Sequence, residues 1–220
     1  MGILTFRSRT SRTVVSVRRS SILALAVILF AIGFAVAAAA TKAKVTLIGD
    51  SVADRMERNP VAISALNDQF RLNLETRGCR RLVSTSCTIQ GSSGPPPTVL
   101  QLVNRLSQNI GKIVVVDVGY NDTPSHYDHD LDTVMRVLRK LGVERVVWLT
   151  LRDPHHVYQA SNADIRREPK EWPGFVIADW DSYSENHPSW FESDGIHLTH
   201  LGAAKLGEFI SSVLVHSARR

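Results

Sequence analysis

The chain has 220 residues, of which 44% are hydrophobic and 21% charged, a composition typical of one globular domain with a sizeable core. The formal net charge of +5 comes from the start of the chain, where five arginines and no acidic residue precede residue 41. The remainder is near neutral, which argues against nucleic acid as a partner.

A basic segment followed by an apolar one opens the chain. The basic part ends at Arg18 and Arg19, and an uncharged apolar run extends from Ile22 to Ala40, where small residues end it. Such an end suits a signal peptidase, but ~20 apolar residues are also enough to span a bilayer. Residues 1–41 are therefore expected to be a signal peptide or an N-terminal membrane anchor, and both alternatives stay open. In either case residues 42–220 form an exported domain, secreted or held outside the cell membrane.

The first predicted strand covers residues 44–48, where Val, Thr, Leu and Ile follow Lys44, and it stops at Gly49, Asp50 and Ser51. A run of this kind is typical of a parallel sheet that is covered on both faces. Ligands of open α/β sheets bind beyond the carboxyl ends of the strands, so Ser51 is placed to meet a substrate. Asp and Ser are also common helix caps, and the tripeptide alone leaves a purely structural role open.

The spacing of apolar residues predicts a helix over residues 61–77, followed by a weak strand near Leu82 and Val83. The chain has two cysteines, Cys79 and Cys87, which flank a short segment within this region. In an oxidising compartment we expect a disulfide between them, and two thiols are too few for a structural zinc site.

The rest of the chain alternates helices and strands after a glycine- and proline-rich loop at residues 90–97. The expected elements are a helix at 99–106 capped by Thr98, a strand at 113–118, a helix at 130–141, a strand at 145–151, a strand at 175–178 and a closing helix at 201–215. This alternation predicts an α/β fold in which helices cover both faces of a parallel sheet.

Polar loops follow successive strands, and together they suggest nucleophilic catalysis. A serine such as Ser51 needs a base to remove its proton, and the imidazole of His197 is well matched to that task. Asp194 stands three residues earlier on the same loop, within reach of the second ring nitrogen. These three residues are the candidate catalytic set, although an Asp-x-x-His sequence alone is more often a surface loop.

An oxyanion formed during acyl transfer needs hydrogen-bond donors. The candidates are the backbone N–H groups of Ser51 and Gly94 and the side-chain amide of Asn121, from three different loops. Gly91, in the same loop as Gly94, remains an alternative for the glycine. Asn121 is followed by Asp122, and this pair is also typical of a turn.

Other clusters favour plainer interpretations. The paired histidines lack the spacing of a metal site and are expected in solvated loops, and the aromatic residues near the carboxyl terminus are expected to pack in the core, with Trp180 and Trp190 as alternatives for lining a substrate groove. The histidines are His126, His129, His155 and His156.

The order of these motifs resembles the SGNH hydrolases, also called GDSL esterases and lipases. Gly49-Asp50-Ser51-Val52 matches the first block of that family, Gly119-Tyr120-Asn121-Asp122 the third and Asp194-Gly195-Ile196-His197-Leu198 the fifth. The second block is less clear, because Gly91-Ser92-Ser93-Gly94 is followed by three prolines. The resemblance covers residues 45 to about 215, and the cysteine segment looks like exported bacterial members.

The resemblance implies a three-layer α/β/α, flavodoxin-like fold and ester hydrolysis through an acyl-enzyme, with no metal or organic cofactor. Ser51 would be the nucleophile, His197 the base and Asp194 its partner, with Ser51, Gly94 and Asn121 as the oxyanion hole. The expected substrates are small-molecule or glycan acyl esters, such as acylated envelope carbohydrates. An O-acyltransferase with the same triad and a non-catalytic envelope binding protein are the alternatives.

Overall fold

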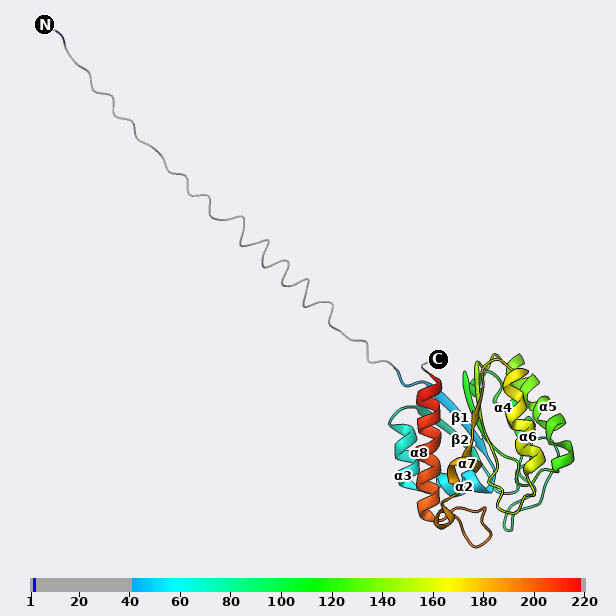
Figure 1. Cartoon of the computed structure of the whole chain (residues 1–220). Helices are drawn as coiled ribbons and strands as arrows, with labels where there is room; N and C mark the ends of the chain where they lie inside the picture. The colour runs from blue at the N-terminus through cyan, green and yellow to red at the C-terminus, as the bar shows by residue number, and fades with distance from the viewer. Residues whose placement is uncertain (1, 3–40, 219–220) are drawn as a thin grey trace. The chain divides into compact units, whose positions relative to one another are not determined.

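Five parallel strands form the centre of the domain in this computed structural model, which describes Gly2 and residues 41–218 (Figure 1). The strands are β1 (Lys44–Gly49), β2 (Arg71–Thr76), β3 (Ile113–Asp117), β4 (Arg145–Leu149) and β5 (Phe175–Ala178). They lie in the order β2-β1-β3-β4-β5, and each neighbouring pair is parallel. This is the flavodoxin-like order of a doubly wound sheet, so the predicted fold class is confirmed.

Helices cover both faces of the sheet and complete three layers. Figure 1 shows α2 (Ser51–Glu57), α3 (Pro60–Asn67) and α8 (His200–Ser217) on one side, and α4 (Val99–Leu106), α5 (Tyr127–Lys140) and α6 (Gln159–Arg167) on the other. The short α7 (Trp180–Ser184) follows β5. Single 3-10 turns lie at Ser107–Ile110, Pro124–His126, Glu168–Lys170 and Pro188–Trp190.

The strands divide their side chains between two buried clusters. Val45, Leu47 and Val115 belong to the cluster that contains residues of α2, α3 and α8. Val114 and Val116 belong to the second cluster, with residues of α4, α5 and α6. Neighbouring residues of a strand point to opposite faces, and this explains why the strands read as unbroken apolar runs in the sequence.

The helix predicted over residues 61–77 is wrong in its second half. Helix α3 ends at Asn67, and the residues from Arg71 to Thr76 form β2, paired in parallel with β1 along its whole length. The spacing of Phe70 and Leu74 fits one helical face, but Leu72 and Leu74 alternate along an edge strand. The strand expected near Leu82 is also wrong, because residues 82–83 are irregular and the Leu82 N–H donates to the side chain of Asp122 at 3.0 Å.

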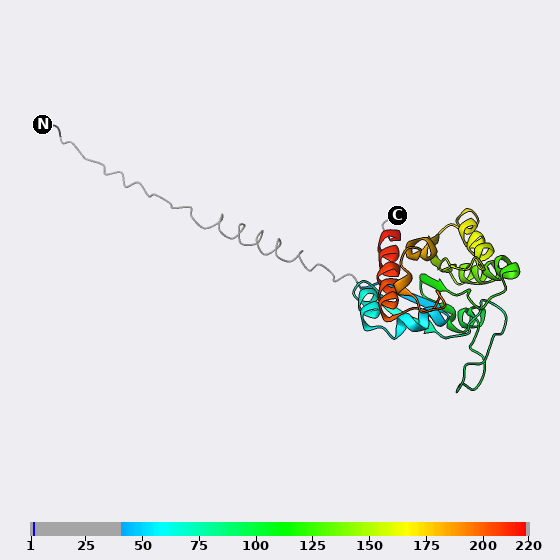
Figure 2. The same cartoon turned by 60° about the horizontal axis from the view of Figure 1, so that its bottom comes forward.

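The segment between β2 and α4 is a long loop that projects from the body of the domain (Figure 2). Cys79 and Cys87 form the expected disulfide across its first part. Cys79 has a φ of 62°, a left-handed conformation that is uncommon outside glycine.

We expect the disulfide to stabilise the fold. Replacing Cys79 and Cys87 together by serine should lower the free energy of unfolding by about 2 to 3 kcal/mol, since closing even a short loop restricts the unfolded chain. Denaturant unfolding of the oxidised protein and the double variant measures the difference. Equal stability of the two would contradict the expectation.

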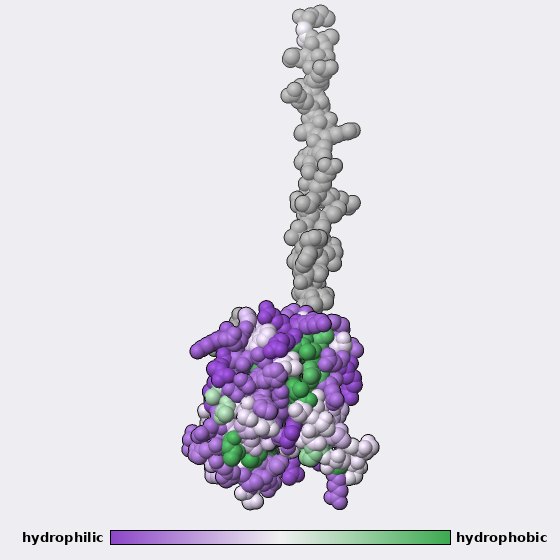
Figure 3. All heavy atoms as spheres, turned by 90° about the vertical axis from the view of Figure 1, so that its right-hand side faces the viewer, coloured by the Kyte–Doolittle hydropathy of each residue, from purple (hydrophilic) through white to green (hydrophobic). Residues whose placement is uncertain are grey.

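Residues 42–218 form a compact unit, and apart from Gly2 and Thr41 the predicted leader lies outside the described residues. Within the part of the chain that the structure describes, we find no helix both long and apolar enough to cross a bilayer. The face on the side of α5 and α6 is mainly hydrophilic (Figure 3), as expected for helices that turn their apolar residues toward the sheet.

Candidate active site

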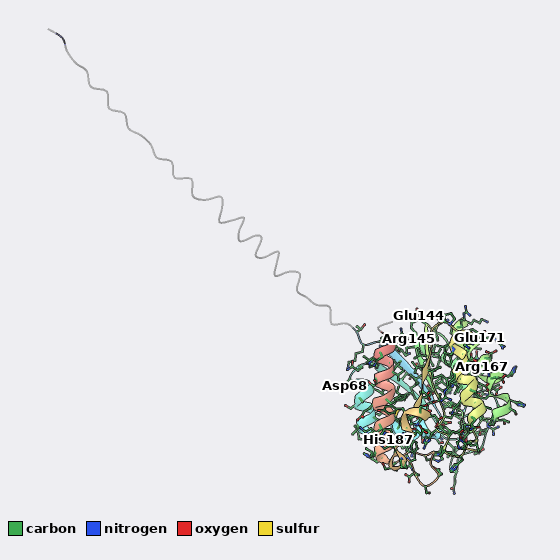
Figure 4. The ribbon with its side chains drawn as sticks, in the orientation of Figure 1. Asp68, Glu144, Arg145, Arg167, Glu171 and His187 are labelled. Atoms are coloured by element: carbon green, nitrogen blue, oxygen red, sulfur yellow. A yellow bond between two sulfur atoms is a disulfide. The ribbon has the colours of Figure 1, made fainter. Side chains whose placement is uncertain are left out.

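Three side chains from two distant parts of the sequence meet at the carboxyl end of the sheet. Ser51 Oγ lies 3.1 Å from Nε2 of His197, and Nδ1 of the same imidazole lies 2.6 Å from Oδ2 of Asp194. In Figure 4, His187, which precedes the loop of Asp194 and His197, lies at the opposite end of the domain from Arg145, the first residue of β4. The three predicted side chains therefore form one hydrogen-bonded row.

Asp50 fixes the position of Ser51 at the junction of β1 and α2. Its carboxylate accepts the N–H of Val52 at 3.1 Å, as a helix cap, and those of Gly119 and Tyr120 at 3.3 Å each, from the loop after β3. Burial raises the pKa of Asp50, and the three N–H bonds oppose that rise. The carboxylate thus joins the end of β1, which carries Ser51, to the end of β3.

His197 lies on the loop at residues 190–199, which is closed on itself by hydrogen bonds between its two ends. It is closed by the N–H of Glu192, which donates to the His197 carbonyl at 2.7 Å, and by an antiparallel bridge between Phe191 and Leu198. Gly195 has a φ of 72°, and a Cβ there would lie 2.9 Å from Pro154, so the turn requires glycine.

Asp194 holds this turn and the imidazole at once. Its Oδ1 accepts the N–H groups of Ile196 and His197, each at 2.9 Å, while Oδ2 faces the ring. Burial alone would raise the pKa of Asp194, but these hydrogen bonds and the imidazole lower it to about 2. The carboxylate is therefore ionised at neutral pH, as a partner for imidazolium must be.

Asn121 lies in the loop after β3 with its amide partly engaged. Its Nδ2 donates to the Arg80 carbonyl at 3.3 Å, which leaves the second N–H of the amide for another acceptor. The structure thereby connects Asn121 to the segment after β2.

The glycine at the end of the second strand is Gly78, and not one of the glycines predicted for the oxyanion hole. Since β2 ends at Thr76, Gly78 follows it by two residues, and a Cβ on Gly78 would lie 3.9 Å from the Ser51 Cβ. Gly91 and Gly94 belong to the projecting loop, and a Cβ on either would meet no atom within 4 Å. The sequence predicted a helix in this region and therefore gave Gly78 no place near Ser51, although a glycine after an alternating run is a usable signal for the end of a strand.

A buried arginine, Arg80, ties the strand ends of the site together, and sequence reasoning did not single it out. It is 3% exposed, and its guanidinium donates to the carbonyls of Pro97 at 3.0 Å, Gly49 at 3.3 Å and Glu75. Burial lowers the pKa of Arg80 to about 10, so the group is still charged at neutral pH. One side chain therefore holds together β1, β2 and the loop before α4.

Asp122, in the loop after β3, makes the free energy of unfolding depend on pH. Burial raises its pKa to about 7, although the N–H of Leu82 opposes the shift. The folded pKa lies above the unfolded one, so this carboxyl costs stability as the pH rises from about 4 to about 7. Asp122→Asn, which keeps an oxygen for Leu82, should exceed the wild type in unfolding free energy by more than about 1 kcal/mol at neutral pH. Denaturant unfolding of the wild type and Asp122→Asn at about pH 4 and about pH 7 measures this effect. A difference in unfolding free energy that is the same at both pH values would contradict it.

The aromatic residues near the carboxyl terminus pack mainly in the core, as the sequence predicts. Trp180 is fully buried and stacks on Trp190 at 5.8 Å, and Phe191 packs against the same ring at 6.1 Å. This packing supports the loop of Asp194 and His197 and leaves Trp180 no surface for lining a groove. Among the described residues, no group of three or more His, Cys, Asp and Glu side chains is arranged to hold a metal ion.

The chain resembles known proteins in its structure but not detectably in its sequence. No family model and no curated protein matches the chain. A family 3 carbohydrate esterase from Talaromyces cellulolyticus superposes with a TM-score of 0.60 at 15% identity, covering 79% of this chain and 97% of that one. A family 3 carbohydrate esterase from Clostridium thermocellum superposes with a TM-score of 0.58 at 11% identity, covering 81% of this chain and 98% of that one. A candidate SGNH hydrolase from Slackia heliotrinireducens superposes with a TM-score of 0.58 at 12% identity, covering 79% of this chain and 100% of that one. At these identities the likeness establishes the fold, which this chain shares with SGNH-type hydrolases.

Proposed function

We propose that the chain is an SGNH-type serine esterase that hydrolyses acyl esters through an acyl-enzyme. The observation that carries this proposal is the row in which Ser51 Oγ, the two ring nitrogens of His197 and Asp194 Oδ2 follow one another at 3.1 and 2.6 Å. Imidazole placed between an alcohol and an ionised carboxylate is the arrangement that activates a serine nucleophile.

In the proposed reaction, Ser51 Oγ attacks the carbonyl carbon of the ester while His197 Nε2 takes its proton. The imidazolium that forms is stabilised by Asp194, and it then protonates the leaving alcohol as the C–O bond breaks. Water attacks the acyl-enzyme, with His197 again accepting a proton and returning it to Ser51. The negative charge on the tetrahedral oxygen is stabilised by the free N–H of Asn121 and by backbone N–H groups of Ser51 and a neighbouring glycine.

Alanine substitutions can show whether Gly78 or Gly94 supplies the oxyanion N–H. Gly78→Ala should lower kcat about 10-fold or more, because the new methyl would occupy space in contact with Ser51, where a small displacement of the bound ester lowers the rate steeply. Gly94→Ala should change kcat by less than about twofold, because its Cβ would point into open space. Initial rates with p-nitrophenyl acetate measure both. A large loss of kcat in Gly94→Ala with little change in Gly78→Ala would instead assign the oxyanion N–H to Gly94. Gly91→Ala tests the remaining alternative.

The proposed nucleophile can be tested without knowing the natural substrate. A fluorophosphonate probe should label the native protein once, on the peptide that contains Ser51, and heat-denatured protein should stay unlabelled. Absence of labelling under conditions in which the protein is folded would favour a non-catalytic binding protein instead.

Acyl transfer to a sugar hydroxyl is the second candidate. The side chains of Asp194 and His197 are 48% and 46% exposed, so an acceptor alcohol can approach the acyl-enzyme as readily as water does. Product analysis with a sugar acceptor present distinguishes the two reactions, because transfer yields an acylated sugar in place of free acid.

We also propose that residues 1–41 direct export of the domain, residues 42–220. The Cys79–Cys87 disulfide supports a location in an oxidising compartment, where such bonds persist. In that setting the substrates are small or glycan acyl esters outside the cytoplasm. Detection of the reduced protein only in the cytoplasm of the source cells would contradict this placement.

A further inference from the structure

A polar cleft lies beside the candidate active site along the same edge of the sheet. It has a volume of about 530 Å³ and is bounded by the loop after β4, by α6 and by α7. The strand order places β3 between β1, which leads to Ser51, and β4, so the cleft begins roughly 10 Å from the serine along the edge. This is too far for an acetyl group bound to Ser51 and within reach of an extended substrate.

Direct contacts connect the walls of the cleft to the catalytic loop. His155 Nε2 lies 3.2 Å from the Asp194 carbonyl, and Pro154 packs against Gly195. On the side of β3, the Tyr120 hydroxyl accepts the N–H of Arg152 at 2.7 Å. The cleft and the row of Ser51, His197 and Asp194 are therefore built on one continuous set of loops.

The lining of the cleft suits a neutral, hydroxyl-rich ligand. Apart from Pro154, the residues that line it are polar or charged, and they combine arginines with carboxylates and with the amide of Gln159. A wall of this kind offers hydrogen-bond donors and acceptors, and its charges are of both signs, so it favours neither an anion nor a cation. It is also unsuited to an acyl chain.

Arg152 is held in the wall of the cleft by residues from two other loops. Its side chain is 12% exposed and packs over the ring of Phe191, with the guanidinium carbon 5.2 Å from the centroid. One terminal nitrogen donates to the Glu185 carbonyl at 3.3 Å, but Nε is buried without a partner among the described residues.

We propose that this cleft binds the carbohydrate part of a glycan ester while the ester group lies at Ser51. The inference rests on the proposed esterase function and adds the substrate class to it. Binding energy from sugar units remote from the ester would then hold the scissile bond at Ser51, so a glycan ester should be preferred to a simple aryl ester.

The test uses Gln159→Ala and Glu185→Ala, two exposed residues of the cleft that lie outside the catalytic row. Substrates are p-nitrophenyl acetate and a panel of partly O-acetylated neutral oligosaccharides (cello-, xylo-, manno- and chito-oligosaccharides). For the best oligosaccharide, each variant should raise KM about 10-fold with kcat unchanged, the expected loss of one hydrogen bond to a charged or amide group. Turnover of p-nitrophenyl acetate should change less than twofold. Lys112→Ala, at the amino end of β3, is the matched control and should alter neither.

The outcomes separate this proposal from the one on which it rests. Hydrolysis of p-nitrophenyl acetate with no lower KM for any oligosaccharide, or with KM for the oligosaccharides unaffected by both variants, would overturn the cleft as a sugar site and leave the esterase intact. Equal losses on both substrates would also overturn it, since they would indicate a general structural effect. Absence of hydrolysis of every ester would instead remove the proposed function itself.

Discussion

Ser51→Ala should lower kcat for p-nitrophenyl acetate by at least about 10⁴-fold while leaving the fold intact. The variant removes the atom that forms the acyl-enzyme, and losses of this size follow removal of a serine nucleophile elsewhere. The backbone of Ser51 begins α2 and is capped by Asp50, so the helix does not need the hydroxyl. Initial rates and thermal unfolding should be measured on the same preparation.

Ser64→Ala provides the matched control, because Ser64 is an exposed serine on α3, away from the carboxyl end of the sheet. It should retain full turnover and full labelling by a fluorophosphonate. Retention of more than a tenth of the activity in Ser51→Ala, with contaminating esterases excluded, would remove Ser51 as the nucleophile.

Arg80→Ala should be the most damaging substitution outside the row of Ser51, His197 and Asp194. The carbonyls of Pro97 and Glu75 would lose this donor in a partly buried position, and the Gly49 carbonyl would keep only the Arg77 N–H at 3.1 Å. Each such loss costs on the order of 1 to 3 kcal/mol. We therefore expect the free energy of unfolding to fall by about 3 kcal/mol or more, as measured by denaturant unfolding.

The same substitution should also lower kcat in the fraction that remains folded. The Arg80 carbonyl accepts from the Asn121 amide, so movement of the Arg80 segment displaces a proposed oxyanion donor. Arg80→Lys should recover only part of both losses, because an ammonium group cannot reproduce the planar fork. Arg77→Ala, an exposed neighbour, is the control. An unfolding free energy for Arg80→Ala within 1 kcal/mol of the control would contradict the role.

The parts of the fold that the sequence predicts are those with local causes. The apolar runs that became β1, β3 and β4 are buried on both faces, so their composition alone identifies them, and β5 is a shorter apolar run in which Val176 and Ile177 are half-buried. Asp194 and His197 lie in one short loop, and their proximity needs no long-range folding. Ser51 follows a buried strand directly, which places it at the sheet edge once the strands are parallel.

The parts that the sequence did not predict depend on contacts between distant segments. β2 is an edge strand whose half-buried leucines fit a helical face as well as a strand, and its pairing with β1 decides between the two. Helix α6 has few apolar residues, and its buried Asn162 is held by the backbone of Leu151, at 2.7 Å from the N–H and 2.8 Å to the carbonyl. Arg80 reads as a surface charge until the carbonyls of three other segments surround it.

The double engagement of Asp194 has a consequence for how its contribution to catalysis can be measured. One oxygen organises the backbone of the turn and the other faces the imidazole, so replacement of the acid by alanine also releases the peptide that carries the base. Mutant kinetics at this position will combine an electrostatic loss with a positional one, and the apparent energy of the Asp–His interaction will be too large. Comparison of Asp194→Ala with Asp194→Asn separates the two, because the amide oxygen can still accept the two N–H groups of the turn while the charge beside the imidazole is removed.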